Sequence, residues 1–132
     1  MSENNQPDRL AMQQSQAGMR FIAQTSIYNT GNFERLRQFI ADSYHDTQLA
    51  ETSVEARLNA LQQMQKEVGR IKVKQLLAVN EHYVIIALET EHGDNLIYTE
   101  LKVEEDYPHK ITLFMQRPLT PVADESEGET AS

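Results

Sequence analysis

The chain has 132 residues, a formal net charge of −8 at pH 7 and no cysteine. This length is typical of a single domain. The lack of cysteine excludes a disulfide, a thiolate nucleophile and cysteine-bound zinc. The acidic balance argues against a nucleic-acid partner, because binding to a phosphate backbone requires clustered lysine and arginine.

Both ends of the chain are polar, and we expect them to lie outside the folded part. The composition predicts a disordered N-terminus over residues 1–6, one α+β domain over residues 7–117 and a disordered acidic tail over residues 118–132. The chain starts without a secretory signal and has no apolar run long enough to span a bilayer. We therefore expect a cytoplasmic protein with no membrane partner. The tail is interpreted as solvated, with binding to a basic surface on a partner as the alternative.

Three helices are predicted in the first half of the chain. The first begins near Pro7 and carries an apolar stripe as far as Tyr28, with Gly18 as a weak point in its middle. Gly31 suits the left-handed position that ends a helix, and Asn32 suits the cap of the next one. The corner between these two helices is interpreted as a packing element. A DNA-reading corner is the alternative, and the charge argues against it.

The second helix follows over residues 33–44, and residues 45–51 then show no periodic pattern. Next comes Thr52-Ser53-Val54-Glu55, which predicts a capping box with Thr52 as the cap. Apolar residues recur at helical spacing from there to residue 68, and a glycine follows. A third helix is therefore predicted directly before the strands.

Four strands are predicted over residues 71–79, 83–89, 96–104 and 111–116, where apolar and polar residues alternate between short polar turns. Turns this short require neighbouring strands to be antiparallel. Pro118 is expected to end the regular structure. The sequence thus predicts the α+β class, with three N-terminal helices packed on a curved four-stranded antiparallel meander.

The second strand is apolar on both faces, so it is expected to lie inside the sheet. If one face meets the helices, strict alternation leaves an apolar patch on the other face, rimmed by charged residues, and such patches mark interfaces. We therefore predict a homodimer joined through its sheets. Its predicted interface residues are Leu76, Tyr83, Ile85, Tyr98 and Phe114.

The order of elements resembles the cone-shaped α+β fold of the nuclear transport factor 2-like superfamily, also called cystatin-like. The matching stretches are residues 28–32, with Leu36 and Phe39 after them, residues 68–70 leading into the strands, and residues 108–111. The resemblance is to the version of the domain that stands alone or is joined to serine hydrolases of the β-lactamase type. It implies a dimer through the sheet and a serine-hydrolase-type partner. One departure is that residues 45–51 are too few for the β-hairpin that many members carry, near which their acid–base residues lie.

A cone of this kind can enclose a pocket between helices and sheet. The residues expected to line it are Phe21, Tyr28, Phe39 and Tyr44, and the candidate catalytic residues are Tyr28, Tyr44 and His109. Such tyrosines are more often packing groups whose hydroxyl reaches water. Glu89 is expected to be solvated on the face away from the core.

Three histidines, His82, His92 and His109, fall at turns or strand ends. Hairpin ends alternate between the two edges of a sheet, so we expect exposed histidines and no metal site or cofactor. His45 and Asp46 are interpreted as a loop pair in solvent, with an acid–base pair as the alternative. Phosphate loops and nucleophile elbows are absent from the sequence.

Two functional hypotheses follow. The favoured one is a non-catalytic binding or accessory module that dimerises through its sheet and holds a small apolar ligand. The alternative is a small-molecule enzyme of the isomerase or cyclase type that uses the cone pocket.

Overall fold

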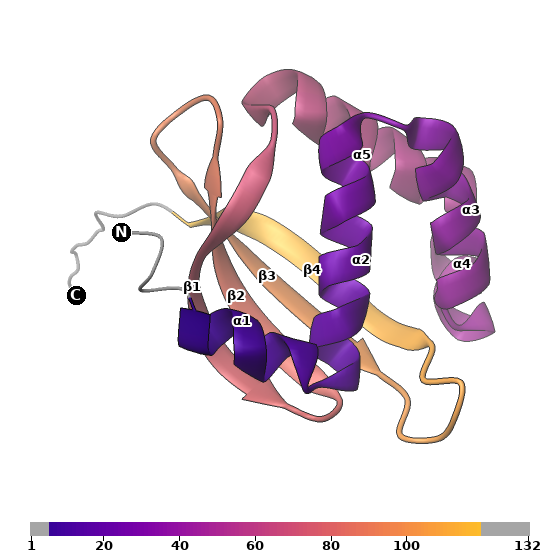
Figure 1. Ribbon diagram of the computed structural model, residues 1–132. Helices are drawn as coiled ribbons and strands as arrows, with labels where there is room; N and C mark the ends of the chain where they lie inside the picture. The colour runs from indigo at the N-terminus through magenta and orange to yellow at the C-terminus, as the bar shows by residue number, and fades with distance from the viewer. Residues whose placement is uncertain (1–5, 120–132) are drawn as a thin grey trace, which may run out of the picture.

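The computed structural model describes residues 6–119, which form five helices followed by four strands (Figure 1). The helices are α1 (Gln6–Gln13), α2 (Gln16–Thr30), α3 (Phe33–Ser43), α4 (Asp46–Glu51) and α5 (Val54–Val68). The strands are β1 (Ile71–Asn80), β2 (Tyr83–Thr90), β3 (Leu96–Val103) and β4 (Ile111–Leu119). This order confirms the predicted α+β class, although the helices number five instead of three.

The first predicted helix is divided into α1 and α2 at Ser15. The Ser15 hydroxyl accepts a hydrogen bond from the Gly18 N–H and so caps α2, while it donates to the Asn80 carbonyl at 2.7 Å. A Cβ atom at Gly18 would lie 2.2 Å from the Met12 carbonyl oxygen. Glycine therefore permits the close approach of α1 and α2. This packing explains why a glycine lies in the middle of the first predicted helix.

The middle of the chain adds α4, which the sequence pattern did not predict. This six-residue helix is stabilised by a side chain of α5: the Arg57 guanidinium donates to the carbonyls of Gln48 and Thr52 at 2.7 and 2.9 Å. The cap of α5 is Ser53, whose hydroxyl accepts from the Ala56 N–H, and Thr52 instead closes α4. The capping-box prediction was therefore displaced by one residue. Gly31 and Asn32 do take the predicted terminal positions of α2 and α3.

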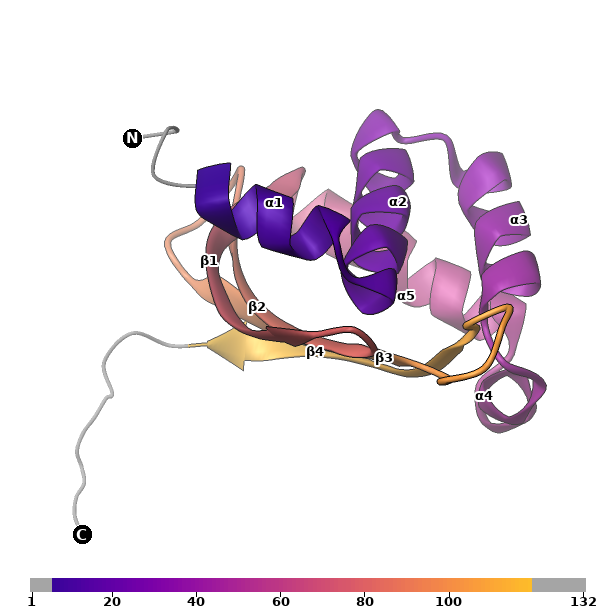
Figure 2. The ribbon, with the colours of Figure 1, turned by 60° about the horizontal axis from the view of Figure 1, so that its bottom comes forward.

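The sheet is an antiparallel meander in the order β1-β2-β3-β4, with β2 in the interior as predicted. The helices pack on one face of this curved sheet, and α4 lies beside the start of β4 (Figure 2). Buried residues of the helices and of the covered face form a single core, built on Phe21, Leu36, Ile86 and Leu101. The opposite face carries no helix among the described residues. We call it the open face.

Three β-bulges change which side chains reach the open face. In β1 the register skips Lys74 and Leu77, and in β4 it skips Thr112. Each extra residue reverses the alternation of faces beyond it. The Asp8 carboxylate of α1 accepts from the Leu76 N–H at 3.1 Å, beside the second bulge of β1.

The bulges correct two of the predicted interface residues. Leu76 lies opposite the buried Ile86, and Phe114 lies opposite the buried Leu101, so both face the helices and pack against the core. Strict alternation had assigned them to the open face. The other three predicted residues, Tyr83, Ile85 and Tyr98, do lie on the open face, because their neighbours along the strand are in the core.

The regular structure extends slightly beyond the predicted domain limits. Gln6 already belongs to α1, and β4 continues through Pro118 to Leu119, so Pro118 does not end the strand. Proline is tolerated there because β4 is an edge strand. The predicted disorder of residues 1–5 and 120–132 lies outside the described residues. Within residues 6–119, none of the helices has the length and apolarity needed to cross a bilayer.

Candidate functional site

The four residues predicted to line an internal pocket belong to the packed interior. Phe21, Tyr28 and Tyr44 are at most 2% exposed, and the half-buried Phe39 of α3 packs against the core cluster. The described surface cavities of about 580 and 430 Å³ are lined by other residues.

Both buried tyrosine hydroxyls are engaged inside the protein. Tyr28 donates to the Gly69 carbonyl at 2.8 Å, and Tyr44 donates to the Gln24 side-chain oxygen at 2.7 Å. Burial raises the pKa of Tyr28 to about 12, and burial also raises the pKa of Tyr44. These hydroxyls therefore stay protonated and serve as internal donors. Both tyrosines are packing groups, but their hydroxyls do not reach water as expected.

His109, the third catalytic candidate, lies outside the core in the connection between β3 and β4. Its ring stacks on that of His82 at 5.8 Å, and its Nδ1 lies 3.1 Å from the Glu104 carbonyl oxygen. Arg20 of α2 donates to the carbonyls of Pro108 and His109 and so fixes this connection to the helices. No hydrogen bond or ring contact within residues 6–119 joins His109 to Tyr28 or Tyr44.

The three turn histidines are not brought together. His82 and His109 meet at one end of the sheet, whereas His92 lies in the β2–β3 turn at the other end, where its N–H donates to the Val68 carbonyl. Residues 6–119 contain no group of three histidine or carboxylate side chains that could hold a metal ion. The remaining histidine, His45, caps α4 through Nδ1.

His45 also faces a different carboxylate from the one that follows it in the sequence. Its Nε2 lies 3.8 Å from a carboxylate oxygen of Glu104, and the other oxygen of Glu104 accepts from the Lys110 N–H. The predicted neighbour Asp46 instead occupies the first turn of α4. The histidine is therefore part of the junction between α4 and the sheet.

The open face has a regular layout, because the strand register aligns its side chains in rows across the sheet. The acidic row is Ala78, Ile85, Glu100 and Met115, and the basic row is Gln75, Ala87, Tyr98 and Arg117. Beyond the acidic row lies the pocket row, which is Asn80, Tyr83, Lys102 and Leu113. Beyond the basic row lies the far row, which consists of the pairs Lys72–Glu89 and Leu96–Leu119.

The centre of the open face is apolar. Ile85, Tyr98 and Met115 are half-buried, and Ala87 is only 3% exposed although it does not belong to the core cluster. Charged side chains surround and cover these residues: the Arg117 guanidinium lies 4.3 Å from the centre of the Tyr98 ring. An apolar centre with a charged rim is the layout of a protein interface.

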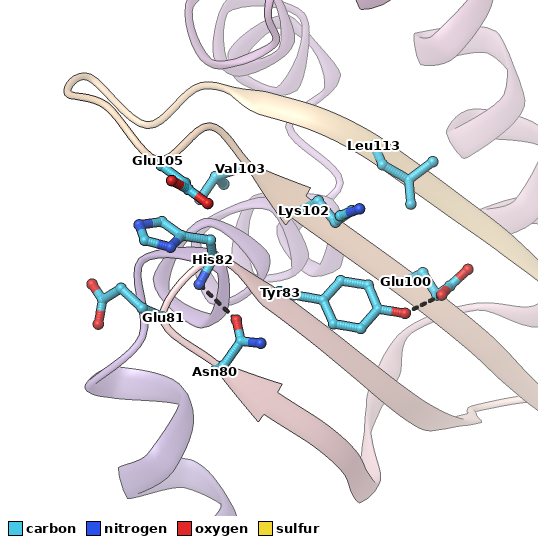
Figure 3. Close-up of a pocket in the computed structure, with 9 residues that line it drawn as sticks. All are labelled: Asn80, Glu81, His82, Tyr83, Glu100, Lys102, Val103, Glu105 and Leu113. Atoms are coloured by element: carbon cyan, nitrogen blue, oxygen red, sulfur yellow. Dashed lines mark hydrogen bonds between the residues drawn. The ribbon is translucent and has the colours of Figure 1, made fainter.

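One end of the open face is hollowed into the larger cavity, of about 580 Å³ (Figure 3). The Tyr83 side chain points across it and its hydroxyl donates to the Glu100 carboxylate, while the Lys102 ammonium lies 5.6 Å from the centre of the Tyr83 ring. The bond to Glu100 raises the pKa of Tyr83 to about 12, with desolvation and the negative charge adding to it. Glu81, His82 and Glu105 line the rim of the same cavity.

Sequence reasoning missed several members of the open face, including Leu113, Met115 and Arg117. The bulge at Thr112 places Leu113 and Met115 there, and strict alternation had placed both with Ile111 in the core. A bulge leaves no reliable mark in composition, since Thr112 is also an ordinary strand residue. Glu89 lies on the open face opposite Lys72, as its position in the strand predicted.

Comparison with known proteins gave no match to a protein-family model, to a curated protein or to a solved structure. The resemblance to the nuclear transport factor 2-like superfamily therefore stays a prediction.

Proposed function

We propose that this protein is a non-catalytic binding or accessory module that acts as a homodimer, with the open face of the sheet as the contact between the two copies. The observation that carries the proposal is the apolar centre of that face. Ile85, Tyr98 and Met115 come from three adjacent strands, and none of them packs against the core. Burying such a surface removes apolar area from water and stabilises association.

The alternative function, an enzyme of the isomerase or cyclase type, has weaker support. It requires an ionisable group with a tuned pKa and a hydroxyl donor that converge on a substrate cavity. Tyr28 and Tyr44 donate to internal acceptors, and His109 lies in a surface connection. A binding function has no such requirement, so we favour it.

A small apolar ligand and a serine-hydrolase-type partner are further parts of the proposal. The hydrolase partner rests only on the resemblance to the nuclear transport factor 2-like superfamily. The ligand rests on the same resemblance, because the residues expected to line its pocket fill the packed interior. Native mass spectrometry of the freshly purified protein tests the ligand: a mass excess that disappears on denaturation supports it, and the bare chain mass contradicts it.

Dimerisation is tested by light scattering after size exclusion, over a range of protein concentrations. The expected mass is twice 15.1 kDa. Ile85→Lys places a charge in the apolar centre and should yield the single-chain mass. Leu10→Lys is the matched control, because Leu10 is 56% exposed on α1 and its replacement should leave the dimer intact. A single-chain mass for the unmodified protein up to about 100 micromolar would refute the proposal.

A further inference from the structure

The two central rows of the open face carry opposite charges. Glu100 is the charged residue of the acidic row, and Arg117 is the charged residue of the basic row. Register places Glu100 beside Met115 and places Tyr98 beside Arg117, so the two charges lie on neighbouring strands one row apart. The open face therefore presents an ordered charge pattern around its apolar centre.

This pattern distinguishes the two simple ways to pair the open face with its copy. A face-to-face homodimer has its two-fold axis in the plane between the sheets. If the axis runs along the strands, each row meets the same row of the copy, so the acidic row faces the acidic row and the basic row faces the basic row. If the axis runs across the strands between the central rows, the acidic row of each copy meets the basic row of the other.

We propose that two copies pack open face to open face about a two-fold axis across the strands, so that Glu100 of each copy pairs with Arg117 of the other. This inference rests on the proposed dimer and adds its orientation and its specific contacts. Like charges held opposite each other in an interface weaken it, whereas opposite charges select one register. The charge pattern therefore favours the axis across the strands over the axis along them.

The side chains are already arranged for this contact. Arg117 stacks on the Tyr98 ring and keeps its guanidinium at the open face, where it can pair with a carboxylate while it remains stacked. Glu100 lies at the edge of the 580 Å³ cavity, so the guanidinium from the second copy enters the mouth of that cavity. In the free chain the Glu100 carboxylate is held there by the Tyr83 hydroxyl.

The size of the open face indicates how large a share of the dimer contacts the two ion pairs should form. Four strands spaced by about 4.8 Å, with eight residues at about 3.3 Å each, present roughly 500 Å² per copy. Standard interfaces bury about 800 Å² per partner, so the dimer should be of modest affinity. In such an interface two symmetric ion pairs form a large share of the specific contacts.

Charge reversal tests the pairing. Glu100→Arg and Arg117→Glu should each weaken dimerisation about tenfold or more, measured by sedimentation velocity, because each places like charges across the axis. The double variant E100R/R117E restores opposite charges and should dimerise within about threefold of the unmodified protein. Glu67→Arg and Arg35→Glu are the matched controls, since both residues are exposed on helices, and neither change should alter dimerisation. Circular dichroism verifies that each variant is folded.

Thiol cross-linking provides a second test that keeps the charges of the central rows, and the absence of cysteine from the chain makes it clean. On β3 the proposed axis brings Lys102 of one copy opposite Leu96 of the other, with the two sheets about 10 Å apart. A mixture of the K102C and L96C variants should therefore be joined by a bis-maleimide reagent that spans about 10 Å. K102C alone should not cross-link, because its two copies would be about 20 Å apart.

The outcomes separate the two proposals. An unmodified protein that stays a single chain refutes the dimer and this inference together. A dimer that is unaffected by both single charge reversals, with K102C cross-linking to itself, refutes the orientation and leaves the proposed function standing. A dimer that responds to the reversals and traps the mixed pair supports both.

Discussion

Replacing Gly18 with alanine should displace α1 relative to the sheet. The added Cβ would lie 2.2 Å from the Met12 carbonyl oxygen and 2.7 Å from the Met12 Cα, both of which are backbone atoms. A side-chain rotation cannot relieve this contact, so α1 must move by roughly 1 Å to reach ordinary van der Waals separation. The perturbation is therefore a displacement of the whole first helix.

The cost follows from what α1 and its junction hold in place. A shift of that size lengthens the hydrogen bonds from Ser15 to the Asn80 carbonyl and from the Leu76 N–H to Asp8, each worth about 1 kcal/mol. It also partly exposes Met12, now 1% exposed, at a cost of about 1 kcal/mol. The helical preference of alanine over glycine offsets about 1 kcal/mol. The net loss in the free energy of unfolding should be about 2 kcal/mol.

Urea denaturation followed by circular dichroism measures this loss, and amide hydrogen exchange locates it. Exchange of the Leu76 amide should accelerate in Gly18→Ala, because that amide donates to Asp8 of α1. Gly93→Ala is the control: its Cβ would meet no atom within 4 Å, and its φ of +95° costs about 1 kcal/mol without moving α1. An unchanged urea midpoint together with unchanged Leu76 protection in Gly18→Ala would refute the reasoning.

Two further predictions concern the buried tyrosines. Tyr44→Phe removes the donor to the buried Gln24 oxygen and should lower the free energy of unfolding by about 1–3 kcal/mol in urea, while wild-type stability would show that this oxygen finds another donor. Tyr28 has a pKa raised to about 12, whereas tyrosine in the unfolded chain ionises near 10, so its stabilising effect is complete below pH 10 and is lost as pH rises towards 12. Tyr28 should contribute up to about 3 kcal/mol to the fall in the free energy of unfolding over that interval. Tyr28→Phe should make the fall shallower by that amount, while Tyr44 and Tyr83 keep their own contributions, and an equally steep fall in the variant contradicts the assignment to Tyr28.

Most of the fold could be predicted from short stretches of the sequence. The helix ends at Gly31 and Asn32 depend on the conformational freedom of one residue and the side-chain oxygen of another, so they can be recognised from the sequence alone. The four strands and their antiparallel order follow from alternation between short turns. The interior position of β2 follows from its two apolar faces.

The shorter elements depended on contacts from residues outside their own segments. Helix α4 has too few residues to be stable alone, and Arg57 from α5 holds its carbonyls. The division between α1 and α2 is stabilised by the turn between β1 and β2, whose Asn80 and Glu81 carbonyls bind Ser15 and Ala17. No pattern within α1 and α2 records these partners, which lie more than sixty residues away.

The sequence by itself determined the fold class, the order of the elements and the existence of an apolar second face on the sheet. Only the tertiary structure decided which residues occupy that face, because the bulges at Lys74, Leu77 and Thr112 reverse the alternation wherever they occur. They turn Leu76 and Phe114 towards the helices and align Glu100 and Arg117 in adjacent rows of the open face. A bulge is selected by how the whole strand fits the sheet and the helices above it, and that fit exists only once the chain has folded.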